Sequence, residues 1–196
     1  MDNDTHRDES KGSTYERLVS AGMAMLVEKG YLGATTRDIA RVAGVTEVTL
    51  YRHFRSKDDL LSAGIARQTK CMFDVIIDPT GDLEQDLLML AKGIATSISA
   101  DIDHIVSIIP ELGRYPVLLT ENVQRNIQKF RDDLATFFRH YQETGDLTED
   151  ADDEIVMVFA GPMFANMLFG KTINAPVVFD FESYVTHFLA GYRKKS

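Results

Sequence analysis

The stretch GVTEVTLYRHF, residues 44–54, is apolar along one side and polar along the other. At helical spacing Val45, Leu50 and Phe54 fall on the apolar side, which would pack on the segment before it. The outward positions carry short, polar or aromatic hydrogen-bonding side chains, namely Thr46, Glu47, Thr49, Tyr51 and His53. The stretch therefore predicts a short helix with one side packed and the other available for contact.

Capping signals divide the neighbouring sequence into short helices. Thr35 is followed three residues later by Asp38, which is the pattern of a capping box, and the helix that it opens should stop at Gly44. Thr46 is then placed to cap the next helix. Two short helices joined by a tight turn with glycine predict a helix-turn-helix motif at about residues 35–54.

A longer helix precedes this motif and another follows it. Apolar residues recur at helical spacing from Tyr15 onward, and Gly30 ends the pattern as a C-terminal cap would. Ser56 and Asp59 form another capping box, which opens a helix through about residue 73. We therefore expect residues 1–11 to form a flexible arm and residues 12–57 to form a small helical domain.

Charge is unevenly distributed along the chain. The net charge is −9, yet residues 12–57 carry seven basic and four acidic residues. In a helix-turn-helix the second helix enters the major groove while the first crosses the phosphate backbone. Thr36 and Arg37 would lie in the first turn of that first helix, where free backbone N–H groups suit a phosphate oxygen, and Lys57 can add a positive charge.

The run EKGYLGATTRDIARVAGVTEVTLYRHFRSKDDLL, residues 28–61, resembles the TetR family of bacterial transcriptional regulators. The resemblance implies a repressor that binds a pseudo-palindromic DNA operator as a homodimer and is released by a small apolar effector. It implies an all-α fold, with the helix-turn-helix domain followed by a larger effector-binding and dimerisation domain at residues 58–196. It also implies phosphate contacts by Thr36, Arg37, Tyr51 and Lys57, and positions on or near the groove for Thr46, Glu47, Thr49, Leu50 and His53.

Glu47 and Val48 stand where the family most often has a Lys-Gly pair. A carboxylate in place of an ammonium group should lower the affinity for DNA of any sequence. Glu47 would instead be able to accept a hydrogen bond from the N4 amine of a cytosine, and Val48 to meet a thymine methyl group. The alternative is that Glu47 points into solvent.

The rest of the chain has the pattern of an all-α domain. Amphipathic helices are expected at residues 83–100, 103–109, 116–144, 150–171 and 181–193, and no stretch alternates as a strand does. The family resemblance implies that the last two long helices form the dimer interface. An aromatic stripe on the final helix supports this, although core packing within one chain explains the same pattern. The predicted interface residues are Phe159, Met163, Phe181, Tyr184, Val185, Phe188, Leu189 and Tyr192.

An effector pocket is a further implication of the resemblance. Methionine and aromatic side chains adapt to irregular apolar ligands, and several lie on the middle helices. The candidates, each of which ordinary core packing would also explain, are Met89, Phe130, Phe137, Tyr141, Met163 and Met167.

Other classes of function find little support in the sequence. The single cysteine, Cys71, excludes an internal disulfide, and the five histidines lack the spacing of metal ligands, so no metal and no cofactor is expected. No nucleophile motif or glycine-rich phosphate loop indicates an enzyme. The polar start and an apolar run limited to residues 155–169 favour a cytoplasmic protein outside the membrane. The alternative function is a helical small-molecule-binding or catalytic protein in which the helix-turn-helix is only scaffold.

Overall fold

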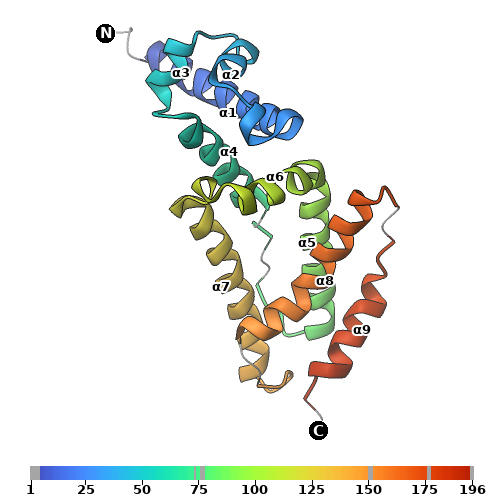
Figure 1. The fold of residues 1–196 in the computed structure, drawn as a ribbon. Helices are drawn as coiled ribbons and strands as arrows, with labels where there is room; N and C mark the ends of the chain where they lie inside the picture. Colours follow the sequence, from blue (N-terminus) through green and yellow to red (C-terminus); the bar gives the residue numbers. More distant parts are fainter. Residues whose placement is uncertain (1–4, 73, 76–77, 150–151, 176–177, 195–196) are drawn as a thin grey trace. The chain divides into compact units, whose positions relative to one another are not determined.

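The computed structural model describes residues 5–72, 74–75, 78–149, 152–175 and 178–194 (Figure 1). Within these ranges the chain is helical and forms no strand, which confirms the all-α prediction. It divides into two compact units. The first comprises Met1–Thr69 and Ser107–Gln124, and the second comprises Lys70–Val106 and Arg125–Ser196.

The N-terminal part of the first unit is built from four helices, and the start signals of three of them were readable in the sequence. The Oγ atoms of Thr35, Thr46 and Ser56 each accept a hydrogen bond from the backbone N–H three residues on, at 3.1, 3.2 and 3.1 Å. These bonds satisfy N–H groups that have no partner inside the helix. The four helices are α1 (Thr5–Gly33), α2 (Thr36–Val42), α3 (Glu47–His53) and α4 (Lys57–Met72). The predicted starts of α2, α3 and α4 are therefore confirmed.

The boundaries of the first unit differ from those expected. Helix α1 begins at Thr5, so it includes part of the predicted arm, and it is kinked at Gly30, whose φ of 68° is left-handed. The unit also extends beyond residue 57, because Leu60, Leu61 and Ile65 of α4 are buried. Gly22 of α1 allows the close approach, since a Cβ there would lie 2.2 Å from Leu60 Cδ2. The first part of α4 is thus core of the first unit.

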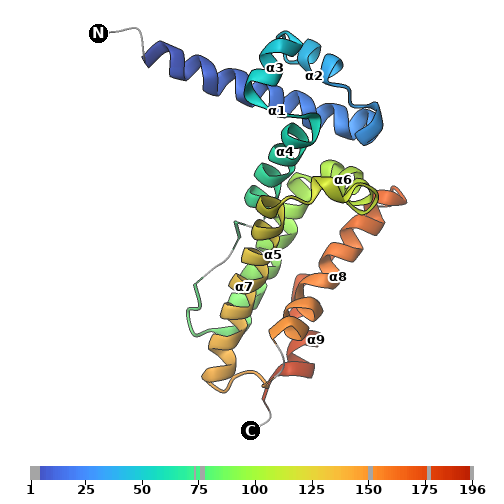
Figure 2. The same cartoon turned by 60° about the vertical axis from the view of Figure 1, so that its left-hand side comes forward.

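The second unit holds most of the remaining helices. Helix α5 packs against both α8 and α9, and the three helices lie together in both views (Figures 1 and 2). The predicted helix at 103–109 continues through Pro110 to Arg114, and the one expected at 116–144 is divided into a short 3₁₀ turn and a long helix. The remaining elements of the chain are α5 (Leu83–Ala100), α6 (Ile102–Arg114), η1 (Pro116–Leu118), α7 (Glu121–Glu143), α8 (Asp152–Thr172) and α9 (Phe181–Tyr192). Of these, α6 ends in the first unit, η1 lies within it, and α7 begins in it.

A buried carboxylate ties the segment before α5 to α5 and α7. Asp86 is 0% exposed and accepts hydrogen bonds from the Thr80 backbone N–H at 2.7 Å, from the Thr80 hydroxyl at 2.8 Å and from the Tyr141 hydroxyl. Burial raises the pKa of Asp86, but the hydrogen bonds from Tyr141 and Thr80 outweigh it and leave the pKa below its ordinary value. The charge is thus stabilised by donors from two other segments.

Candidate nucleic-acid interface

Helix α3 is anchored by its apolar side. Leu50 is 0% exposed and Phe54 is 3% exposed, and the Phe54 ring stacks on Tyr15 of α1 with 5.0 Å between ring centroids. The side chain of Leu50 lies completely inside the core, so it has no surface with which to contact a base. Leu50 instead fixes the direction in which the opposite side of α3 faces.

The exposed side of α3 carries hydrogen-bonding groups that are already linked to one another. The Thr36 hydroxyl, in the first turn of α2, donates to Glu47 Oε1 at 2.8 Å, and the Tyr51 hydroxyl lies 3.5 Å from Thr36 Oγ1. Thr46 and Thr49 share a hydrogen bond of 3.0 Å between their hydroxyls. The structure thus brings Thr36, Glu47 and Tyr51 together across the two helices of the motif, with a carboxylate among the predicted phosphate contacts.

The other predicted contact residues differ in their exposure. Arg37 is exposed and His53 is half-buried. Val48 is 72% exposed. Its position leaves both methyl groups available for an apolar contact outside the chain.

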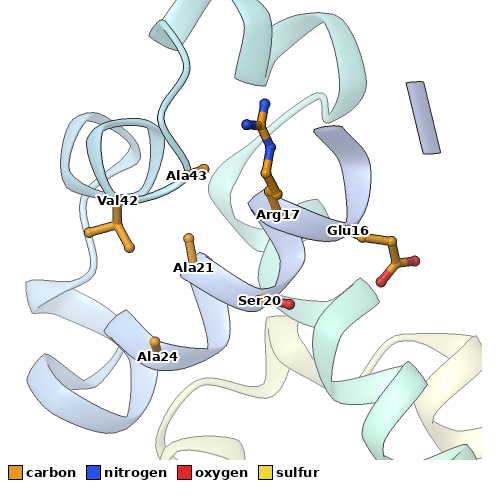
Figure 3. A pocket seen from close by; sticks show the side chains of 7 residues that line it. All are labelled: Glu16, Arg17, Ser20, Ala21, Ala24, Val42 and Ala43. Atoms are coloured by element: carbon orange, nitrogen blue, oxygen red, sulfur yellow. The ribbon is translucent and has the colours of Figure 1, made fainter. Parts of the chain in front are cut away.

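Exposed cations of the first unit that were not singled out in the sequence include Arg17, Arg52 and Arg55. Arg17 borders a shallow pocket of about 430 Å³ between α1 and α2. Figure 3 shows its guanidinium directed away from Glu16, which pairs instead with Arg67 of α4. The only sequence signal for these residues was the positive charge of residues 12–57.

Asp38 pairs with two other cations of the unit. Arg41 donates to Asp38 at 3.1 Å, and Lys29 lies 3.6 Å from the same carboxylate. The hydrogen bond from Arg41 lowers the pKa of Asp38, with smaller contributions from Thr35 and Lys29. Asp38 thus takes part in the capping box and also neutralises the positive charges of Arg41 and Lys29.

Lys57 occupies a defined position at the start of α4. Its Nζ donates to the Tyr31 backbone carbonyl at 2.6 Å and lies 4.0 Å from the centroid of the Tyr31 ring. Both contacts place the ammonium group at the C-terminal part of α1. An ammonium group has three donors, so the bond to Tyr31 leaves capacity for a phosphate oxygen.

The predicted dimer residues lie largely within the core of one chain. Phe159, Met163, Val185, Phe188 and Leu189 are each no more than 6% exposed. Phe159 and Phe188 pack edge to face at 5.0 Å, and Tyr184 donates to the Phe159 carbonyl at 2.5 Å. Burial raises the pKa of Tyr184 to about 12. The aromatic stripe of α9, including the half-buried Phe181 and Tyr192, therefore packs against its own unit. This is the core packing within one chain that the sequence pattern allowed as the alternative to a dimer interface.

The exposed side of α8 carries a different apolar surface. Met157, Gly161, Ala165 and Phe169 follow one another at four-residue spacing, and Val158 lies beside them. Met157 is 60% exposed and Phe169 is 65% exposed. By length and composition alone α8 is apolar enough to cross a bilayer, although a third of its most apolar 18 residues are buried within the protein. We call these five residues the α8 face.

The predicted effector residues are scattered over the second unit. Phe130, Phe137 and Tyr141 are core residues, and Met89 is 49% exposed. Met163 and Met167 line a cavity of about 400 Å³. The other residues around this cavity are Ala95, Thr96, Ser99, Phe179 and Phe181. Its lining includes hydroxyl groups and no charged side chain.

Comparison with known proteins identifies the family. The family model for bacterial regulatory proteins of the tetR family matches residues 18–63. The chain is 30% identical over 171 residues to YvkB, an uncharacterised helix-turn-helix-type transcriptional regulator of Bacillus subtilis strain 168, covering 83% of this chain and 88% of YvkB. It is 32% identical to the TetC protein of transposon Tn10 from Escherichia coli, over 60% of this chain and 59% of TetC.

Solved structures share the fold at low sequence identity. The flavonoid-responsive regulator FrrA aligns with a TM-score of 0.77 at 20% identity, covering 94% of this chain and all of FrrA. The fatty acid degradation regulator FadR from Bacillus halodurans aligns with a TM-score of 0.70 at 19% identity, covering 90% and 92% of the two chains. With the capped helix-turn-helix and the match to YvkB, these findings show that the chain belongs to the TetR family and is a DNA-binding transcriptional regulator.

Proposed function

We propose that the protein is a cytoplasmic repressor that binds a pseudo-palindromic operator as a homodimer and leaves it when a small apolar molecule binds. The observation that carries this proposal is the exposed side of α3, which presents Thr46, Glu47, Thr49 and Tyr51 beside the first turn of α2. Such a helix reads base edges in the major groove while the helix before it meets the phosphates.

Selection from a random duplex library tests this proposal directly. Purified protein is incubated with the library near physiological salt, and the retained DNA is sequenced. We expect an inverted repeat with half-sites about one helical turn apart, because a two-fold symmetric dimer reads a two-fold symmetric site. Recovery of a single half-site contradicts the dimer, and absence of DNA binding at low salt supports the scaffold alternative.

The dimer is supported by the α8 face rather than by the aromatic stripe. A monomer rarely exposes a continuous apolar surface of this kind. Gly161 and Ala165 are small, and a Cβ added at Gly161 would have no neighbouring atom within 4 Å, so a second helix can approach closely there. We propose that the α8 faces of two chains pack against each other.

The cavity lined by Met163 and Met167 suits an uncharged effector. A buried carboxylate without a cation is strongly disfavoured, and no charged side chain lines this cavity. FrrA is described as flavonoid-responsive, and FadR as a regulator of fatty acid degradation. Of these two ligand classes, the lining favours a neutral aromatic compound with a hydrogen-bonding group over a fatty-acid anion.

Replacement of Thr96 tests this site. Thr96→Val removes a hydroxyl from the cavity wall and keeps the side-chain shape. We expect binding of a neutral flavonoid, followed by quenching of its absorbance or by calorimetry, to weaken about fivefold, as for loss of one neutral hydrogen bond. Thr136→Val on α7 is the matched control, because both hydroxyls donate to the carbonyl four residues earlier at 2.8 Å. Equal binding by both variants contradicts the site.

Glu47 provides a test of the interface. Glu47→Gln keeps an oxygen for Thr36 but removes a negative charge beside the proposed phosphate contacts. We expect affinity for random-sequence DNA to rise about fivefold, the effect of one unit charge about 4 Å away in water. Glu28→Gln, an exposed residue of α1, is the control for net charge. If Glu47 also reads a base, the same variant binds the selected operator more weakly than the wild type does. A variant that matches the wild type in affinity for both the operator and random-sequence DNA would show that Glu47 has neither role.

A further inference from the structure

Tyr31 holds the ammonium group of Lys57 from two directions. The backbone carbonyl of Tyr31 accepts from Nζ at 2.6 Å, and its ring lies beneath Nζ at 4.0 Å. A lysine side chain otherwise has many rotamers, and it loses this freedom when it meets a phosphate. Here the loss has already occurred in the folded protein, so Lys57 is preorganised.

Tyr31 is in turn fixed by a set of contacts within the first unit. Its backbone N–H donates to Glu111 Oε2 at 2.8 Å, its hydroxyl donates to Asp58 at 2.7 Å, and its ring packs on Tyr115 with centroids 4.3 Å apart. The hydrogen bond to Asp58 raises the pKa of Tyr31. The backbone N–H, the carbonyl, the ring and the hydroxyl of one residue are thus all engaged.

Glu111 contacts Tyr31 from 80 positions further along the chain. Its side chain is only 13% exposed although it is charged. The left-handed Gly30 precedes Tyr31, and the carboxylate of Glu111 lies about 3.5 Å from where a Cβ of Gly30 would be. Glu111 therefore binds the backbone at the kink of α1, where regular helical hydrogen bonding is interrupted.

We propose that Tyr31, Glu111 and Tyr115 are positioning residues for DNA binding, which hold the Lys57 ammonium group where it meets a phosphate. This inference rests on the proposed phosphate contact of Lys57. It assigns a role in DNA affinity to two residues, Glu111 and Tyr115, that lie outside the helix-turn-helix and need not touch DNA.

Glu111→Ala separates this role from plain electrostatics. Loss of a carboxylate from a DNA-binding protein by itself strengthens binding. The proposal requires the opposite result, which is binding about threefold to tenfold weaker. The slope of log affinity against log salt concentration should also become shallower by up to one unit, as for one lost phosphate contact. Affinity is measured by fluorescence anisotropy on a duplex carrying the selected site, over a series of salt concentrations.

Two variants serve as controls for Glu111→Ala. Glu121→Ala removes an exposed carboxylate at the start of α7, and we expect binding that is unchanged or slightly tighter. Glu111→Gln keeps an oxygen that can accept from the Tyr31 N–H, and we expect a salt dependence close to that of the wild type. Thermal unfolding of each variant shows that the protein is folded at the temperature of the binding measurement.

A double-mutant cycle with Lys57→Ala tests whether Glu111 affects DNA affinity through Lys57. If Glu111 acts through Lys57, Glu111→Ala has no further effect on affinity or salt slope once Lys57 is alanine. Additive effects, or binding by Glu111→Ala equal to that of Glu121→Ala, overturn the inference. If Lys57→Ala alone leaves the salt slope unchanged, the proposed phosphate contact fails instead, and the two failures are thus distinguished.

Discussion

Asp86→Ala is expected to lower the free energy of unfolding by about 3 kcal/mol, because it leaves three donors, of which the Tyr141 hydroxyl is buried, without their shared acceptor. The donors are the Thr80 N–H and hydroxyl and the Tyr141 hydroxyl. Alanine is the better helix former, so a loss of stability cannot come from helix propensity. For a chain of this size the melting temperature should fall by about 10 °C, measured by circular dichroism.

The control for Asp86→Ala lies four residues earlier. Asp82 is exposed and caps α5 by accepting from the Gln85 N–H at 3.1 Å. Asp82→Asn should change the stability by only a few tenths of a kcal/mol, because asparagine caps helices about as well. Tyr141→Phe removes one of the three donors to Asp86 and should have an intermediate effect. A stability of Asp86→Ala within error of that of Asp82→Asn would show that the buried network contributes nothing.

The contribution of Asp86 should depend on pH in a defined direction. Its folded-state pKa is depressed, so the stabilisation is fully present above the unfolded pKa, which is about 3.9 for aspartate. It is lost as the pH falls through the lower folded-state pKa. The difference in stability between wild type and Asp86→Ala should therefore be constant near neutrality and become smaller below about pH 4, as measured by urea unfolding at each pH.

Gly161→Arg on the α8 face is expected to abolish operator binding through loss of the dimer. Arginine introduces a long charged side chain at the centre of an apolar contact between helices, where an unpaired buried charge is strongly unfavourable. Two linked half-sites bind about 10² to 10⁴ times more tightly than one, so a monomer should lose at least about hundredfold in operator affinity. Light scattering reports the mass and fluorescence anisotropy reports the affinity.

Thr136→Arg provides the matched control for this variant. It adds the same positive charge to an exposed position of the second unit, on α7. We expect a dimer with wild-type operator affinity. A wild-type mass for Gly161→Arg places the dimer interface elsewhere, whereas a monomer that still binds the full operator tightly contradicts the link between dimerisation and binding.

Local features of the fold were predictable because they depend on neighbours in sequence. Thr35, Thr46 and Ser56 cap helices through bonds to backbone groups three residues away, and spacing alone reveals this pattern. The end of α6 was placed too early, because Pro110 is tolerated within the helix, which continues to Arg114. A proline in a sequence shows a local preference but not whether surrounding contacts overcome it.

Long-range features were not predictable in the same way. The stripe of α9 that includes Val185 and Phe188 has the same spacing whether it faces its own core or a second chain, and only the structure shows it in the core. The contact of Glu111 with Tyr31 joins residues 80 positions apart. No periodic pattern predicts such a pair, and the position of Lys57 follows from it.

The carboxylate at the start of α3 also affects how the protein finds its site in a genome. An operator competes for its regulator with about 10⁶ to 10⁹ other positions in the genome, each of which binds the regulator weakly. Glu47 lies beside Thr36 and Tyr51, where it opposes the attraction to any phosphate. We therefore expect each visit to an incorrect site to be shorter, so that fewer molecules per cell are needed to keep one operator occupied.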